Sequence, residues 1–179
     1  MNRVLFILCI FLIGCSNNEQ LPPIPRPKAY PRPTLYSAEY SSQKLNYSNS
    51  NLEINKSANF IALNDGWFNI EYPAYNITVN CTFTKVTKKS LSQVLQNRNE
   101  RIALNLNGAY CHVTSWNGTD IIVANSALRT PVQFIATDSA SFVLSGVAVA
   151  NFPPQTRPDS VAPYINAVAA DITHMLKHL

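Results

Sequence analysis

The sequence predicts an α+β domain in which a mainly antiparallel sheet packs against two long helices, preceded by a disordered Pro-rich tether. Three patterns carry this prediction. Apolar and polar residues alternate along residues 75–86, an Asn-Gly pair joins two strand-like segments at 117–118, and apolar residues recur every three or four positions from Val161 to Leu179. Strands joined by hairpins, with helices kept apart from them, are typical of an antiparallel α+β fold.

The first 14 residues have the form of an export signal. Arg3 provides a positive charge, and residues 4–13 are an almost unbroken apolar run. A run of about ten residues is too short to cross a hydrocarbon core of about 30 Å as a helix. The segment ends in Gly14-Cys15, which resembles the bacterial lipobox, where the signal is cut before the cysteine and that cysteine is lipidated. We therefore expect Cys15 to anchor the mature chain to membrane lipid; an ordinary signal peptide with a chance cysteine is the alternative.

Residues 15–37 read as the lipidated cysteine and a tether, and residues 38–179 as a single domain. Six of the chain's 12 prolines fall within 22–33. Proline favours the extended polyproline II conformation, which rises about 3.1 Å per residue, so we expect a semi-rigid spacer. The tether side chains that are candidates for contact with a partner are Arg26, Lys28, Tyr30 and Arg32. Simple solvation of the three charges is the alternative.

The first half of the domain reads as a series of strands. Three short segments have this character: 50–54, 58–63 and 67–72. In the longer segment 75–86, one face carries Ile77, Val79, Cys81 and Phe83, and the intervening positions are Asn or Thr. This alternation is typical of a strand that buries one face.

Two helices and two hairpins complete the domain. Ser90 and Gln93 fit a capping box at the start of a helix that ends at Gly108, and Ser160 is expected to cap the last helix, with Pro163 in its first turn. The first hairpin turns at Asn117-Gly118, a pair that tolerates the positive φ values of a tight turn. The second hairpin joins 132–137 to 141–150 around Asp138-Ser139.

No signature of catalysis or of cofactor binding stands out. The formal net charge is only +4, with 13% charged residues, which is too weak and scattered for a nucleic-acid footprint. The five glycines are too far apart for a phosphate-binding loop, and Cys-x-x-Cys and Gly-x-Ser-x-Gly patterns are absent. We therefore expect a protein that is not an enzyme and that binds neither a cofactor nor nucleic acid.

Three groups of residues remain as candidate sites. Asp171, His174 and His178 share one face of the last helix, but histidines near a helix C-terminus interact favourably with the helix dipole, so we predict no metal site. Cys81 and Cys111 form a disulfide or remain buried thiols; an oxidising compartment permits the bond. Ser139 and Ser160 follow an aspartate, and the tripeptides that contain them resemble the O-glycosylation motif of exported Bacteroidetes proteins.

The ordered set of short motifs along residues 22–178 resembles the gliding-motility lipoprotein GldD family of Bacteroidetes. The matching stretches are 25–32 (PRPKAYPR), 69–73 (NIEYP), 131–139 (PVQFIATDS), 158–163 (PDSVAP) and 171–175 (DITHM). The middle of the chain departs from the family pattern, since residues 98–102 read RNERI. The helix on an antiparallel sheet is also similar to the Mog1/PsbP type of α/β sandwich, as a fold-level analogy.

The resemblance implies a non-enzymatic lipoprotein of the outer membrane that faces the periplasm. It would be an accessory of gliding motility and of the type IX secretion machinery, would be held by the lipid chain on Cys15, and would contact other envelope proteins. The alternative is a lipoprotein that binds a glycan or another small ligand, with Trp67 and Trp116 as stacking residues. A concave aromatic pocket with polar groups favours the second hypothesis.

Overall fold

The structure is a computed structural model, and it describes residues 33–45, 51–64, 66–124, 128–153 and 155–179. The expected export signal and Cys15 lie outside the described residues. The same holds for the tether side chains Arg26, Lys28, Tyr30 and Arg32. Predictions about these positions therefore rest on the sequence.

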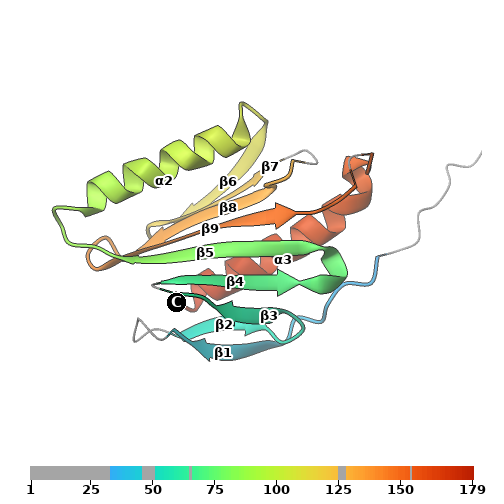
Figure 1. Cartoon of the computed structure of the whole chain (residues 1–179), viewed down its shortest axis with the longest axis horizontal. Helices are drawn as coiled ribbons and strands as arrows, with labels where there is room; N and C mark the ends of the chain where they lie inside the picture. Colours follow the sequence, from blue (N-terminus) through green and yellow to red (C-terminus); the bar gives the residue numbers. More distant parts are fainter. Residues whose placement is uncertain (1–32, 46–50, 65, 125–127, 154) are drawn as a thin grey trace, which may run out of the picture. The chain divides into compact units, whose positions relative to one another are not determined.

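The described residues form a sheet of seven strands and a separate sheet of two (Figure 1). The larger sheet has the order β3-β4-β5-β9-β8-β7-β6, and every neighbouring pair is antiparallel. Its strands are β3 (Asn59–Ala62), β4 (Trp67–Tyr72), β5 (Ile77–Lys85), β6 (Cys111–Trp116), β7 (Thr119–Ala124), β8 (Val132–Thr137) and β9 (Phe142–Ala150). The smaller sheet pairs β1 (Tyr40–Lys44) with β2 (Asn51–Asn55).

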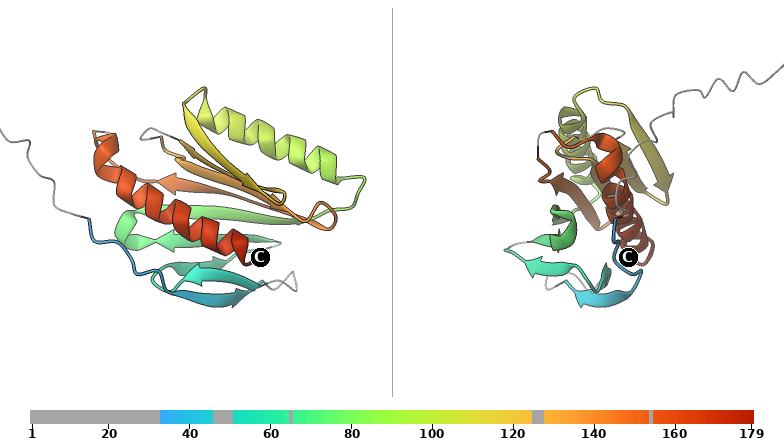
Figure 2. Two further views of the ribbon diagram at one scale, coloured as in Figure 1. Left: turned by 180° about the vertical axis from the view of Figure 1, so that it is seen from behind. Right: turned by 90° about the vertical axis from the view of Figure 1, so that its right-hand side faces the viewer.

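Two long helices cover opposite faces of the larger sheet (Figure 2). They are α2 (Leu91–Leu106) and α3 (Pro158–Lys177). The predicted α+β class, with an antiparallel sheet and two long helices, is confirmed. Among the described residues, no helix is both long enough and apolar enough to span a membrane.

The main hydrophobic core lies between α3 and the sheet. The buried residues of α3 are Val161, Ile165, Val168, Ile172, Met175 and Leu176. They face the predicted apolar side of β5, whose four residues Ile77, Val79, Cys81 and Phe83 are at most 7% exposed. Burying a side chain of this size stabilises the fold by about 1.5–3 kcal/mol. The predicted alternation along β5 is confirmed, and it leaves a row of polar side chains on the face toward α2.

The tight turn between β6 and β7 forms where the Asn-Gly pair predicted it. Asn117 has φ 42° and Gly118 has φ 74°, and two positive φ values are the requirement of a two-residue hairpin turn. A Cβ atom at position 118 would lie 2.7 Å from the carbonyl oxygen of Thr137. Glycine is therefore needed here for space as well as for backbone conformation.

The β8–β9 connection is organised by the carboxylate of Asp138. Its Oδ1 accepts hydrogen bonds from the backbone N–H groups of Ala140 (3.0 Å), Ser141 (2.8 Å) and Phe142 (3.1 Å), and Oδ2 accepts one from the Ser141 hydroxyl. Partial burial acts to raise the pKa of Asp138, but the bonds from Ser141, Ala140 and Phe142 outweigh it and hold the pKa well below its usual range. The turn predicted at Asp138-Ser139 is confirmed.

We expect Asp138→Asn to destabilise the protein at pH 7 by about 1 kcal/mol, because the charge-assisted turn bonds are weakened. A carboxyl group whose pKa is lower in the folded state stabilises the fold above its unfolded pKa of about 3.9, and this stabilisation is lost as the pH falls further. Urea unfolding should therefore show a difference in the free energy of unfolding between wild type and variant that is smaller at pH 3 than at pH 7. Asp120→Asn, which removes an exposed charge from β7, is the control and should leave stability nearly unchanged. An equal gap at both pH values would contradict the prediction.

Both helices begin differently from the predicted pattern. Ser90 precedes α2, but its hydroxyl bonds to Thr87 and makes no capping bond to the helix, so the expected capping box with Gln93 does not form. Helix α3 begins at Pro158, which places Ser160 in the first turn and Pro163 inside the helix. Proline suits the first helical position because its φ is already helical and its missing N–H has no partner there.

Two strand boundaries also differ from the predicted ones. Tyr75 belongs to a short 3-10 turn (Pro73–Tyr75) that precedes β5, because Pro73 opens that turn. Strand β1 was not predicted, since its sequence YSSQK has no apolar alternation. Ahead of β1, Tyr36 at the end of the predicted tether stacks its ring on Tyr75 with 4.5 Å between ring centroids, and its hydroxyl accepts a hydrogen bond from the N–H of Ala74. Ordered packing thus starts before residue 38.

The two cysteines of the domain carry free thiols. Cys81 lies in β5 and Cys111 in β6, with β9, β8 and β7 between them. Neighbouring strands are about 4.8 Å apart, whereas a disulfide needs Cα atoms within about 7 Å. The disulfide considered from the sequence is therefore wrong for this topology. Burial raises the pKa of the Cys81 thiol, so Cys81 behaves as a small apolar core residue.

Candidate functional site

Helix α2 rests on the sheet through a narrow apolar contact. The partly buried side chains Leu91, Val94, Leu95 and Ile102 pack on a small cluster formed by Val86, Ile135 and Val143. No residue of α2 is fully buried, and Leu104 near its end is 77% exposed. The helix therefore covers the polar face of the sheet only in part.

A cleft of about 400 Å³ lies between α2 and this polar face. The sheet contributes Trp67, Asn80, Thr82, Gln133, Phe134, Ser145, Gly146 and Val147, and the helix contributes Arg98, Arg101, Ile102, Leu104 and Asn105. This volume lies within the usual range of small-ligand sites. The polar row that alternation predicted on β5 thus becomes one wall of a cavity.

The charge in the cleft is positive. Arg98 Nη2 donates to Thr84 Oγ1 at 3.3 Å, and burial, followed by the neighbouring charge of Arg101, lowers the pKa of Arg98. None of the described lining residues is acidic, and no described carboxylate lies within ion-pair distance of either guanidinium. Two cations without a counter-ion favour an anionic or acceptor-rich ligand.

One buried donor in the cleft has no acceptor. Gln133 is only 1% exposed, and its Oε1 accepts a hydrogen bond from Asn105 Nδ2 at 2.9 Å. Its Nε2 has no partner among the described residues. A buried amide without a partner costs about 1–3 kcal/mol, so a ligand that accepts this hydrogen bond would recover free energy. Trp67, 51% exposed, presents its ring at the same cleft.

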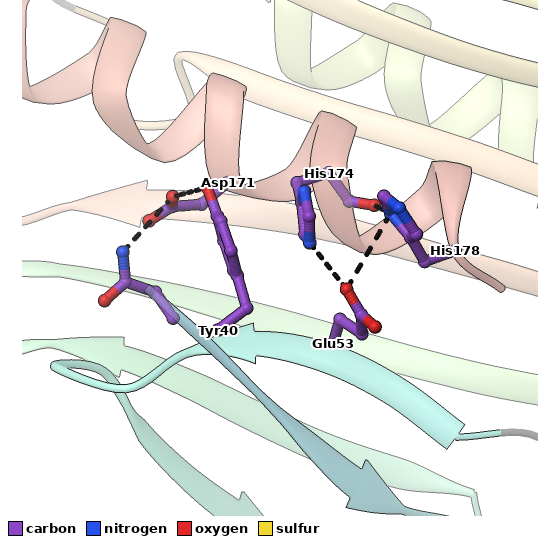
Figure 3. A network of polar contacts seen from close by, with 6 residues as sticks. Tyr40, Glu53, Asp171, His174 and His178 are labelled. Carbon is purple, nitrogen blue, oxygen red and sulfur yellow. Dashed lines mark hydrogen bonds and ion pairs between the residues drawn. The ribbon is translucent and has the colours of Figure 1, made fainter. Parts of the chain in front are cut away.

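A second polar cluster lies where α3 faces the small sheet (Figure 3). Asp171 Oδ1 accepts hydrogen bonds from the hydroxyl of Tyr40 (2.9 Å) and from Asn55 Nδ2 (3.3 Å). Burial raises the pKa of Asp171, and hydrogen bonds from Tyr40, Asn55 and Tyr72 act against that rise. Burial and the bond to Asp171 raise the pKa of Tyr40 to about 12. Asp171 is thus an internal anchor that joins β1 and β2 to α3.

Two histidines at the C-terminal end of α3, His174 in the helix and His178 just after it, lie beside this anchor and face Glu53 of β2. His174 Nε2 is 2.7 Å from Glu53 Oε2, and His178 Nδ1 is 3.9 Å from the same oxygen. His178 Nδ1 is also 2.8 Å from the backbone carbonyl oxygen of His174. The ring of Tyr40 stacks on His174 with 3.6 Å between centroids, which fixes the plane of that imidazole.

The other sequence candidates are dispersed over the domain. Ser139 lies in the exposed β8–β9 turn with φ 60°, and Ser160 lies in the first turn of α3. Trp116 packs partly against the main core, with Lys177 Nζ 5.8 Å from its ring centroid, and is not in the cleft. Of the two tryptophans proposed for ligand stacking, only Trp67 lines the cleft. O-glycosylation of the serines stays a prediction.

Sequence reasoning missed the residues that give both clusters their character. Glu53, Arg98 and Gln133 were not singled out, because each belongs to a segment that local patterns explain as ordinary strand or helix. One indirect signal was present: alternation along residues 75–86 predicted a strand with one polar face, and that face forms a wall of the cleft. The role of Glu53 depends on a contact 121 residues away along the chain.

The chain belongs to the class of lipoproteins, because a lipoprotein family model spans the whole domain and most of the tether. That model, described as gliding motility lipoprotein GldD, matches residues 20–179, and the chain therefore belongs to the GldD family. The resemblance read from the short motifs is confirmed. Among curated proteins, none matches the chain.

Proposed function

We propose that this protein is an accessory component of the gliding motility and type IX secretion machinery, held in the outer membrane and facing the periplasm. The family match over residues 20–179 carries the proposal, because it includes most of the tether as well as the domain. The lipobox-like Gly14-Cys15 supports anchoring by a lipid chain. The protein then acts by binding other envelope proteins at a fixed distance from the membrane.

The proposed contact surface consists of the basic tether and the α2 side of the domain. Arg26, Lys28, Tyr30 and Arg32 supply charge and an aromatic ring close to the start of the domain. Arg98 and Arg101 add positive charge on the domain itself, without a described counter-ion. Acidic partner surfaces are therefore favoured.

The role we propose includes no catalysis. A nucleophile needs a base within hydrogen-bond distance, and among the described residues no serine, threonine or cysteine side chain is hydrogen-bonded to a histidine. His174 and His178 face Glu53 and a backbone carbonyl instead.

The test is a crosslinked pull-down of the full lipidated protein from native envelopes, identified by mass spectrometry. We expect motility or secretion components to be recovered. A charge-reversal variant, Arg98→Glu with Arg101→Glu, should lose partners that use the α2 side. The control is Lys44→Glu with Lys56→Glu, on β1 and in the turn after β2, where Lys56 gives up an exposed ion pair with Glu39. Recovery of the same proteins from both variants would remove the α2 side from the proposal, and recovery of no envelope protein would contradict the role itself.

A second candidate function, binding of a small glycan, is favoured by the unpaired Gln133 amide and the ring of Trp67 in one cleft. An aromatic face and several hydrogen-bond donors suit a sugar ring, and the two arginines suit a sugar carboxylate. Titration of the full chain with digalacturonate and with cellobiose tests this. We expect binding of the acidic disaccharide only, and equal absence of binding for both would exclude acidic sugars of this size.

We expect Gln133→Leu to raise the stability of the ligand-free protein by about 1 kcal/mol. The variant replaces a buried amide that lacks an acceptor by an apolar side chain of similar size. Asn105 loses its acceptor, but it is exposed and water replaces that bond. Thermal unfolding measures the effect, with Gln93→Leu on the exposed face of α2 as the control. A loss of stability larger than that of the control would show that the amide is satisfied in solution.

A further inference from the structure

We propose that Glu53, His174 and His178 bind a divalent transition-metal ion, best matched by Zn²⁺. One nitrogen from each imidazole and one carboxylate oxygen lie within 4.8 Å of one another. Two imidazoles and one carboxylate are a ligand set that suits Zn²⁺ and leaves a fourth position for water. This inference is independent of the partner role proposed above.

The separation of the ligand atoms is close to what an ion requires. Bonds of about 2.1 Å in a tetrahedral site place neighbouring ligand atoms about 3.4 Å apart. Glu53 Oε2 lies 2.7 Å from His174 Nε2 and 3.9 Å from His178 Nδ1. Shifts on the order of 1 Å at the side-chain ends therefore suffice to bring the ligand atoms to these separations. The side chains have room for such shifts, because Glu53 is 41%, His174 27% and His178 48% exposed.

The elements that carry the three residues bring them together from distant parts of the chain (Figure 3). His174 lies in the last turn of α3, and His178 is the residue that caps the C-terminus of this helix, four positions later. Glu53 projects from β2, the strand of the small sheet that packs on α3. A helix and a strand with well-packed neighbours hold such side chains more firmly than loops do.

Neighbouring groups orient the proposed ligands. Tyr40 stacks on the His174 ring at an interplanar angle of 12°, and its hydroxyl is held by Asp171. His178 Nδ1, the nitrogen that lies 3.9 Å from Glu53 Oε2, also lies 2.8 Å from the backbone carbonyl oxygen of His174. Binding of the ion through Nδ1 requires His178 to give up this hydrogen bond.

Asp171 is excluded as the third ligand, although it was the carboxylate that the sequence placed beside the two histidines. Its Oδ1 is occupied by the bonds from Tyr40 and Asn55, and it lies on the far side of Tyr40 from the histidine pair in Figure 3. Glu53 takes its place. The sequence analysis predicted no metal site from Asp171, His174 and His178 alone, because Glu53 is far from these residues in the sequence.

Metal binding at this position would join the small sheet to the end of α3. Among the described residues, the β1–β2 sheet forms no ladder with the seven-stranded sheet, so side-chain packing, including that on α3, holds it in place. The small sheet is also the first part of the domain after the tether. An ion bridging β2 and α3 would therefore fasten the point where the tether meets the domain.

Zinc binding by the full lipidated chain, free of any affinity tag and kept in detergent, tests the proposal. After treatment with a chelator, the protein is dialysed against Zn²⁺ and the metal per chain is measured. We expect one ion per chain for the wild type and for His112→Asn, an exposed histidine on β6 outside the cluster. We expect at least tenfold weaker binding for Glu53→Gln and for His174→Asn.

Two further readouts separate this site from a merely structural ion pair. Zinc should raise the thermal unfolding midpoint of the wild type and of His112→Asn, each relative to its own metal-free baseline, and should not raise that of Glu53→Gln. Co²⁺ should bind without a thiolate-to-cobalt absorption band, because no cysteine belongs to the site. Absence of stoichiometric zinc in the folded wild type, unchanged affinity in Glu53→Gln and His174→Asn, or a thiolate band would each overturn the proposal.

Discussion

Replacing Gly146 by valine is expected to lower the free energy of unfolding by about 3 kcal/mol. A Cβ atom at this position of β9 would lie 2.4 Å from Cε1 of Phe134 and 3.2 Å from Sγ of Cys81. Phe134 is 0% exposed and Cys81 is 1% exposed, so neither the ring nor the thiol has space to move into. The valine must therefore displace the core against α3, and such overpacking costs more than a surface substitution.

Urea unfolding of the full chain measures this effect, and the neighbouring Ser145 supplies a matched control. Ser145 lies on the same strand but on the opposite face, where the cleft beneath α2 provides space. Ser145→Val is expected to change stability by less than about 1 kcal/mol, because it adds the same side chain to a strand without a clash. If both valine variants lost equal stability, the contact with Phe134 would not be the cause.

A double variant identifies the clash directly. Phe134→Leu removes the ring atoms nearest to position 146 and by itself destabilises the core by leaving a cavity. Combined with Gly146→Ala, it should cost clearly less than the sum of the two single variants, because the alanine fills part of that space. Additive losses would mean that the glycine is required for another reason, such as the backbone geometry of β9.

The parts of the fold that the sequence predicted well are those set by local chemistry. Alternation along residues 77–83 placed one face of β5 in the core, and Asn117-Gly118 marked a turn whose φ values only a few residue types adopt. The apolar spacing of α3 identified its buried face. In each case the determining interactions lie within a few residues of one another, so the pattern in the sequence contains them.

The errors have an equally physical origin. Ser90 and Ser160 both fit a capping pattern, but neither caps its helix. The hydroxyl of Ser90 bonds to Thr87 instead, and Pro158 begins the last helix two residues before Ser160. Strand β1 has no apolar alternation. It forms because it pairs with β2 and because the hydroxyl of Tyr40 bonds to Asp171. Such long-range partners leave no local periodicity.

The candidate sites show the same limit. Alternation predicted one polar face on β5, but the cleft on that face exists because β9 lies next to β5 and β8 lies next to β9, an order that local patterns do not specify. The histidine pair was visible on α3, yet its carboxylate partner is Glu53, 121 residues earlier in the chain. Asp171, the acidic residue that the sequence places on the same helix face as His174, instead uses its Oδ1 to accept hydrogen bonds from Tyr40 and Asn55.

Replacing Cys15 by alanine is expected to abolish labelling of the protein by an alkyne analogue of palmitate and to shift the protein from the detergent phase to the aqueous phase on phase separation. Lipid chains contribute about 0.8 kcal/mol per buried methylene, and stable anchoring needs more than one chain or a second signal. Without the acylated cysteine, the remaining apolar run of about ten residues is too short to span the bilayer. The chain offers a matched control in Cys9, which lies within that same run.

Cys9→Ala should keep both labelling and detergent partitioning, since only the cysteine that follows Gly14 fits the lipobox pattern. Cys15 also lies outside the family match, which begins at residue 20, and outside the described domain. The thermal unfolding of Cys15→Ala should therefore equal that of the wild type, so that the variant changes location without changing the fold. Retained labelling in Cys15→Ala would contradict the assignment, because acylation would then occur elsewhere. Lost labelling in both cysteine variants would instead indicate failed export. Recovery of gliding or secretion partners by an unlabelled variant would mean that the domain binds its partners without the lipid anchor.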